Sequence, residues 1–260
     1  MEPTLINDLG DELYRALVSR EAVEPLTNRH PDITIEDAYR IQQRMISHRL
    51  DKGEKVVGKK IGVTSKAVMS MLGVGQPDFG YMLDGMAYPE GQAIDSKTLI
   101  QPKAEGEIAF VLKRDVMGPG VTAAEILAAT EGVMVCFEIV DSRIRDWKIR
   151  IQDTVADNAS CGGFVLGSSL IDVRQADLIT CGMVLEKNGE VVVTGAGAAT
   201  MNSPVNAMVW LANTLGRLGI PLKAGEVVLS GALGAMVPVG AGDQLRVSIG
   251  GLGSCAIRFA

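Results

Sequence analysis

The chain has 260 residues and a formal net charge of -6, and 47% of its residues are hydrophobic. This length predicts one or two domains with a core large enough to fold without disulfide support. The acidic balance, with no basic run longer than Lys59-Lys60, excludes nucleic acid as an expected partner.

Histidine is scarce, since His30 and His48 are the only two and both lie in the first fifth of the chain. A histidine-rich zinc site or a Ser-His-Asp triad would have to be built around one of them, so the ligands of any metal are expected to be oxygens. The cysteines form no Cys-x-x-Cys pair, and no apolar stretch approaches the roughly 18 residues of a membrane span. With no signal-like segment at the start, we expect a cytoplasmic protein without a membrane contact.

Residues 1–55 are predicted to form a helical N-terminal portion. Leu5, Leu9, Leu13 and Leu17 recur every four residues, which is typical of an amphipathic helix. Thr34, followed three residues later by an acidic side chain, predicts the start of a second helix.

Residues 56–260 are predicted to form a β-rich catalytic body. Strands are expected at 106–112, at 133–140 and from 227 onward, with helices after Thr122 and after Ser203. Helices and strands do not alternate strictly, which argues against a doubly wound parallel sheet. The sequence therefore predicts an α+β fold whose mostly antiparallel or mixed sheet curls on itself.

Two lysines, Lys59 and Lys60, lie between Gly58 and Gly62. On a strand they would face opposite sides, and the sequence leaves open which of them enters a cleft. The segment lacks the residue order of a phosphate-binding loop. Asp78 follows in a turn-like setting, where an Asx-turn role is the alternative to a catalytic one.

Three carboxylates are the strongest chemical signal. Glu105 and Glu107 share one face of a predicted strand, where charges about 7 Å apart repel unless a cation lies between them. Glu138 interrupts a strand that is otherwise apolar on both faces, which is costly unless the charge is paired or bound to a metal. Pairing of Glu138 with Arg143 is the alternative. Three carboxylates without histidine favour Mg²⁺ or Mn²⁺.

Small polar segments around Ser160 and at Ser230-Gly231 could present amides and hydroxyls to a carboxylate ligand, or could be plain turns. The charged segment 142–148 is interpreted as a solvated loop, although Arg143 or Arg145 could attract an anion.

Taken in order, five segments resemble the fumarylacetoacetate hydrolase superfamily, and more closely its 2-hydroxypenta-2,4-dienoate hydratases of aromatic meta-cleavage pathways. The resemblance covers essentially the whole chain. It rests on residues 58–65, 76–80, 105–107, 138–143 and 155–161. It implies a mixed β-sheet roll with a helical N-terminal portion.

The resemblance implies a divalent metal, Mg²⁺ or Mn²⁺, held by Glu105, Glu107 and Glu138. It also implies that Lys60 is the cleft lysine and that Asp78 lies near the catalytic water. We expect these two groups to act as acid and base, with the pKa of the lysine lowered toward working pH. Ser160 and the Ser230-Gly231 turn are expected to hold the substrate carboxylate.

The implied reaction is the hydration of 2-hydroxypenta-2,4-dienoate to 4-hydroxy-2-oxopentanoate. One alternative is the 4-oxalocrotonate decarboxylase branch, whose substrate carries another carboxylate and should need an extra basic contact. Another is a non-catalytic subunit that organises a partner enzyme. The resemblance also suggests a homo-oligomer and a possible complex with such a decarboxylase.

Overall fold

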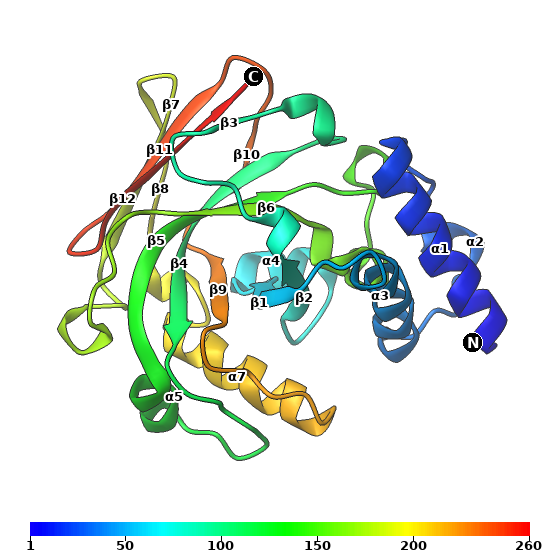
Figure 1. The fold of residues 1–260 in the computed structure, drawn as a ribbon, viewed down its shortest axis with the longest axis horizontal. Helices are drawn as coiled ribbons and strands as arrows, with labels where there is room; N and C mark the ends of the chain where they lie inside the picture. Colours follow the sequence, from blue (N-terminus) through cyan, green and yellow to red (C-terminus); the bar gives the residue numbers. More distant parts are fainter.

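The computed structural model describes residues 1 to 260 and arranges them as two β-sheets flanked by helices (Figure 1). The helices are α1 Pro3–Ser19, α2 Leu26–Arg29, α3 Ile35–Leu50, α4 Lys66–Leu72, α5 Ala123–Ala129, α6 Ile151–Ala156 and α7 Pro204–Arg217. The strands are β1 Val56–Gly62, β2 Asp78–Leu83, β3 Ala93–Ile94, β4 Lys103–Leu112, β5 Thr130–Val140, β6 Cys161–Leu166, β7 Gly182–Lys187, β8 Glu190–Ala196, β9 Val227–Ala232, β10 Val237–Pro238, β11 Gln244–Ile249 and β12 Gly253–Phe259.

The larger sheet has the strand order β2-β1-β9-β4-β5-β6, and β10 adds to β4. Its pairs are antiparallel except β1 with β9. The smaller sheet has the order β3-β12-β11-β7-β8 and is antiparallel except for β12 with β3. Figure 1 shows the long strands β4 and β5 bending strongly across the molecule. The predicted α+β fold with a curled, mixed sheet is confirmed.

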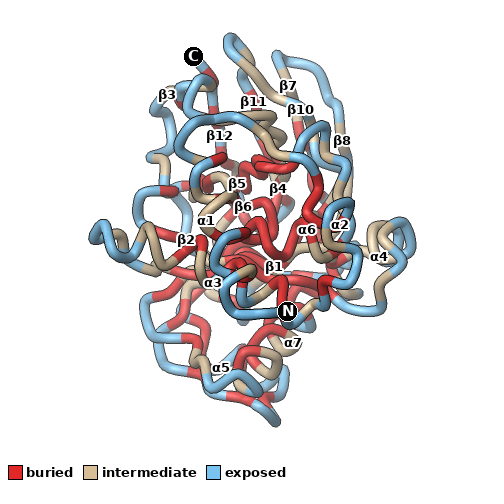
Figure 2. The backbone as a smooth tube through the Cα atoms, turned by 90° about the vertical axis from the view of Figure 1, so that its right-hand side faces the viewer, coloured by how far each residue is buried: buried red, intermediate tan, exposed pale blue.

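The main core lies between the two sheets. Ile108, Phe110 and Phe137 on β4 and β5 join a buried cluster with Leu245 and Val247 of β11, and the buried residues gather in the middle of the molecule (Figure 2). Because side chains alternate along a strand, the opposite face of β4 and β5 is left for other residues. That second face carries the glutamates.

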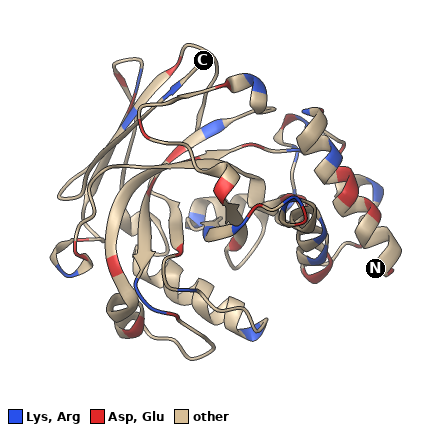
Figure 3. Cartoon of the chain, viewed as in Figure 1, with Lys and Arg blue, Asp and Glu red and all other residues tan.

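The helices α1 and α3 pack against each other and against α6, with Leu13, Ile41 and Val155 in one buried cluster. The Thr34 side chain accepts a hydrogen bond from the Asp37 amide at the start of α3, as predicted. The outward faces of α1 and α3 carry charges of both signs (Figure 3). None of the helices combines the length and the apolar character needed to cross a membrane.

Two short helices lie where the sequence pattern indicated only turns and apolar segments. The Ser65 side chain caps α4 by accepting from the Val68 amide, and α6 covers 151–156. No residue of α4 is buried, and a helix of seven residues is too short to show the repeating apolar stripe by which sequence patterns reveal helices.

Candidate metal centre and active site

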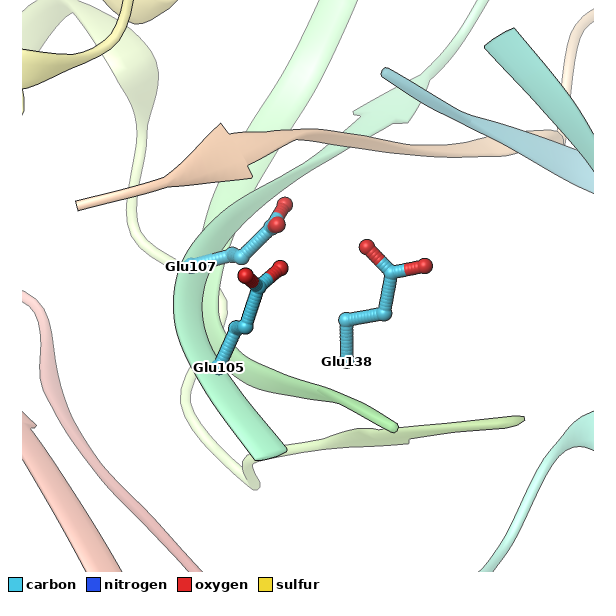
Figure 4. A group of neighbouring side chains, drawn as sticks. All are labelled: Glu105, Glu107 and Glu138. Atoms are coloured by element: carbon cyan, nitrogen blue, oxygen red, sulfur yellow. The ribbon is translucent and has the colours of Figure 1, made fainter. Parts of the chain in front are cut away.

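Strands β4 and β5 bring the three glutamates together. Glu105 and Glu107 flank Gly106 on β4, and Glu138 lies on β5 directly opposite Glu105. One carboxylate oxygen from each lies within 4.8 Å of the others, and Figure 4 shows the side chains converging on one space. A side chain at position 106 would meet Val247 of the smaller sheet at 2.7 Å, so glycine between the glutamates lets the two sheets pack.

The environment of these carboxyl groups disfavours negative charge. Glu107 and Glu138 are completely buried. Burial, reinforced by the nearby charge of Glu138, raises the pKa of Glu105 to about 7. Burial is also the main reason that the pKa values of Glu107 and Glu138 are raised. In the absence of a metal, burial therefore shifts all three carboxyl groups toward their protonated forms.

The hydrogen bonding of the cluster is incomplete. The Gly231 amide donates to Glu107 Oε2 at 2.8 Å, but Glu107 Oε1 and both oxygens of Glu138 accept no hydrogen bond. Buried oxygens without donors need a compensating partner. Because three hard oxygen ligands suit a small divalent cation, the donor set fits Mg²⁺ or Mn²⁺.

The structure decides which lysine enters the site. Lys60 Nζ lies 3.2 Å from Glu138 Oε1 and donates to the Ala159 carbonyl at 2.9 Å. Lys59 faces the other side of β1, where it donates to both oxygens of Glu226 at 2.5 and 2.7 Å. Lys60 is thus the lysine of the cleft, and Lys59 belongs to a separate buried ion pair.

The expectation that the pKa of Lys60 is lowered is wrong for the metal-free chain. Burial by itself lowers this pKa, but the negative charges of Glu138 and Asp78 together outweigh it, and the pKa of Lys60 is raised. The ammonium is therefore the stable form. The expectation considered desolvation and a metal but not the summed charge of the surrounding carboxylates.

Asp78 begins β2 and pairs in register with Gly62 of β1. Its side chain is buried and neither carboxylate oxygen accepts a hydrogen bond. Burial raises the pKa of Asp78, and the Lys60 charge only partly opposes this shift. A methyl group at position 62 would lie 2.3 Å from Asp78 Oδ1 and 3.1 Å from Lys60 Nζ. Gly62 therefore keeps open the space that these two groups share.

A cavity of about 530 Å³ opens onto this cluster. Lys60, Asp78, Glu105 and Ser160 line its polar part. Its remaining wall is mostly apolar and includes Val63, Val68, Met71, Trp147, Ile149 and Met236. Lys60 is the only lysine or arginine that lines it. A small ligand with one anionic end and an uncharged remainder matches this distribution.

The three predicted substrate contacts differ in their placement. Ser160 lines the cavity, and its hydroxyl lies 3.2 Å from that of Thr154. Ser230 is fully buried and donates to the Ile108 carbonyl at 2.8 Å, outside the cavity lining. Gly231 directs its amide at Glu107. Ser230 and Gly231 lie in strand β9 and not in the expected turn, and they support the glutamate cluster rather than facing the cavity.

The segment 142–148 is not simply a solvated loop. Arg143 is fully buried and pairs with Asp157, with Nε 2.5 Å from Oδ1, so it neither partners Glu138 nor is free for an anion. Arg145 is exposed and pairs with Glu24. Trp147, which sequence reasoning missed, lines the cavity, and its indole donates to the Gln101 carbonyl at 3.0 Å.

Comparison with known proteins identifies the group to which this chain is similar. The model of the fumarylacetoacetate (FAA) hydrolase C-terminal family matches residues 69–260. A 2-hydroxypent-2,4-dienoate hydratase of Pseudomonas putida is 66% identical over 221 residues, covering 85% of this chain and 100% of that protein. A 2-hydroxyhexa-2,4-dienoate hydratase of Comamonas testosteroni is 56% identical, covering 98% of this chain and 97% of its own length.

Among solved structures, 4-oxalocrotonate decarboxylase from Pseudomonas putida G7, complexed with magnesium and adipate, superposes with a TM-score of 0.97. The two sequences are 36% identical, and the match covers 100% of this chain and 99% of the decarboxylase. The fold is thus shared in full with an enzyme that has been observed with a divalent metal.

Proposed function

The chain belongs to the fumarylacetoacetate hydrolase family, and we propose that it is a metal-dependent hydro-lyase that hydrates 2-hydroxypenta-2,4-dienoate to 4-hydroxy-2-oxopentanoate. The observation that carries this proposal is the buried carboxylate cluster beside Lys60, at the end of a largely apolar cavity. Such a reaction belongs to the meta-cleavage catabolism of aromatic compounds. The names of the similar hydratases support the reaction type.

Glu105, Glu107 and Glu138 are the residues that would hold Mg²⁺ or Mn²⁺. When bound, the cation would supply Lewis acidity toward the carboxylate and the 2-oxygen of the substrate. The magnesium in the similar decarboxylase supports this assignment.

Proton transfer is proposed for Lys60 and Asp78. In the first step the enol proton leaves O2 and a proton arrives at C5, which gives an α,β-unsaturated ketone. In the second, water forms a bond to C4, one of its protons is lost, and C3 gains a proton. The raised pKa of Lys60 keeps Nζ an ammonium that can donate a hydrogen bond to the oxygen where negative charge develops, while the raised pKa of Asp78 makes its carboxylate a stronger base toward the proton of water.

Ser160 is proposed to contact the substrate carboxylate, since its buried hydroxyl lines the polar part of the cavity. The remaining wall favours the hydratase over the decarboxylase alternative. A second substrate carboxylate would need a cation at the far end, and Lys60 is the only cationic residue lining the cavity. The intact glutamate cluster argues against a non-catalytic subunit.

The Glu107→Gln variant tests the metal assignment. The neutral amide removes one charge from the ligand set, so we expect Mn²⁺ affinity to fall at least about tenfold and hydration to become dependent on excess metal. Isothermal titration with Mn²⁺ and an assay of dienoate loss at limiting Mg²⁺ measure the two effects.

The control is Glu131→Gln, an exposed glutamate on the same strand as Glu138, which should leave both quantities unchanged. Undiminished activity of Glu107→Gln at limiting Mg²⁺ would contradict the assignment. Release of CO₂ from 4-oxalocrotonate in place of water addition would move the wild-type chain to the decarboxylase branch.

We further propose a homo-oligomer that acts in the cytoplasm and associates with a decarboxylase of the same family. The four cysteines are all free and buried, which is compatible with a reducing compartment. Light scattering of the purified protein, alone and mixed with the decarboxylase, tests the assembly.

A further inference from the structure

A left-handed turn lies directly beside the candidate active site. Asn158, Ala159 and Ser160 have φ values of 52°, 50° and 54°, and all three residues are buried. Left-handed backbone is unfavourable for residues with a Cβ, and three in succession persist only where the surroundings impose them. The turn must therefore be held by specific contacts.

The turn presents a hydrogen-bond acceptor to the catalytic lysine. The Ala159 carbonyl accepts from Lys60 Nζ at 2.9 Å, and Glu138 Oε1 is the second oxygen near this ammonium, at 3.2 Å. An ammonium has three donors. The bond to Ala159 uses one of them, so donors remain for the cavity that Lys60 lines.

The Asn158 side chain fastens the turn to strand β2. Its Nδ2 donates to the Tyr81 carbonyl at 2.9 Å, and its Oδ1 accepts from the Tyr81 amide at 2.8 Å. Because β2 is the edge strand of the larger sheet, these two bonds occupy backbone groups that a neighbouring strand would otherwise take. Gly80 permits the approach, since a Cβ there would lie 2.4 Å from the Asn158 carbonyl.

A buried ion pair fixes the base of the turn. Asp157 accepts from the Arg143 amide at 2.9 Å and from its Nε at 2.5 Å. Arg143 Nη1 also donates to the Cys161 carbonyl at 3.0 Å. Both ends of the turn are thus held independently of Asn158, so loss of the Asn158 side chain would release the middle of the turn rather than the whole segment.

We propose that Asn158 is a positioning residue for Lys60, because its side-chain amide clamps the left-handed turn to β2 and so directs the Ala159 carbonyl at the Lys60 ammonium. The proposal rests on the function proposed above for the role it gives to Lys60. Asn158 itself does not line the cavity, and it acts through Ala159.

The test uses Asn158→Gly in the metal-loaded enzyme. Glycine adopts the left-handed backbone without strain. This variant therefore removes the two side-chain hydrogen bonds to Tyr81 while the backbone can still adopt the conformation of the turn. We expect kcat to fall at least about tenfold while KM and Mn²⁺ affinity change less than about twofold. A crystal structure should show Lys60 Nζ beyond hydrogen-bond distance of the carbonyl of residue 159, a readout that does not depend on the reaction.

The matched control is Asn213→Ala. The Asn213 side chain also clamps backbone, accepting from Gly120 and Val121 and donating to Val121, but it lies on α7 outside the cavity lining. It should keep the wild-type kcat. If Asn158→Gly does not fold, Asn158→Asp serves in its place, since it keeps the acceptor for Tyr81 and loses the donor.

An unchanged kcat in Asn158→Gly would overturn the proposal. So would a joint loss of kcat, metal affinity and melting temperature, which would mark Asn158 as merely structural. An unmoved Lys60 in the variant structure would overturn it too. Failure of the wild-type enzyme to hydrate any dienoate would reject the proposed function instead, and the crystallographic comparison would still decide whether Asn158 positions Lys60.

Discussion

Lys60 shows how neighbouring charges determine the state of a buried group. Burial alone would favour a neutral amine, yet Glu138 and Asp78 keep the ammonium. The space around Lys60 Nζ and Asp78 Oδ1 is also restricted, because both groups lie so close to the backbone of β1 at Gly62 that an added side chain would collide with them.

The Gly62→Ala variant tests this restriction. The added methyl group would lie 2.3 Å from Asp78 Oδ1, so the carboxylate must move. Since displacement of a reacting group by about 1 Å can cost up to about 100-fold in rate, we expect kcat to fall by at least about tenfold. Steady-state hydration kinetics measure the effect.

Gly182→Ala is the control for that experiment. Gly182 lies on β7, and no atom beyond its chain neighbours lies within 4 Å of the place that an added methyl group would take, so alanine there should be harmless. A wild-type kcat in Gly62→Ala would show that Asp78 tolerates displacement and is not a proton acceptor in the reaction.

At the scale of the element, strand β1 serves two buried sites at once. Alternation along the strand directs Lys60 to the active site and Lys59 to Glu226, which immediately precedes β9. Lys59 and Glu226 are both largely buried. The pair therefore connects two neighbouring parallel strands on the side away from the chemistry.

Lys59→Met should destabilise the fold without changing the reaction. Removing one partner of a buried ion pair leaves the other charge uncompensated, and we expect a loss of about 3 kcal/mol in the free energy of unfolding. Urea denaturation measures it, and kcat should stay close to wild type.

The double variant Lys59→Met, Glu226→Leu is the control, because removal of both charges should recover most of the lost stability. If the urea midpoint of Lys59→Met equals that of the wild type, the ion pair contributes nothing to the free energy of unfolding. Strand β1 would then act on that side through packing alone.

At the scale of the whole molecule, the fold gathers three carboxyl groups that repel one another. Between its ordinary pKa of 4.5 and its folded value of about 7, Glu105 holds a proton in the folded chain and not in the unfolded one. The folded state then binds more protons than the unfolded state, so stability falls as pH rises through this window. Glu107 and Glu138 act in the same direction.

We therefore expect the melting temperature of metal-free protein to decrease from about pH 5 to about pH 7.5. Added Mg²⁺ should raise it strongly at the higher pH and little at the lower one, because protons and the cation compete for the same oxygens. Thermal denaturation by circular dichroism, with EDTA or with Mg²⁺, measures both trends. An equal effect of Mg²⁺ at the two pH values would contradict this linkage. Glu107→Gln should weaken the Mg²⁺ response at the higher pH.

The sequence alone predicted the fold class, the family resemblance and the identity of the charged cluster. These depend on local patterns: alternation on a strand places Glu105 and Glu107 on one face, and a charged Glu138 in an apolar strand requires compensation. Helix starts at Thr34 and Ser203 were equally local, because a cap involves residues only a few positions apart.

The residue pattern left open which lysine enters the site, and only the family resemblance indicated Lys60. The tertiary structure shows the arrangement of both lysines, and it alone decided what charge Lys60 carries and how Ser230 and Arg143 are used. Each of these depends on groups far away in the chain: Glu226 for Lys59, Glu138 for Lys60, Ile108 for Ser230 and Asp157 for Arg143. The scarcity of histidine in the chain restricted the kind of metal site. The pairing of β4 with β5 determined where such a site can form, because the register between two strands cannot be read from either strand by itself.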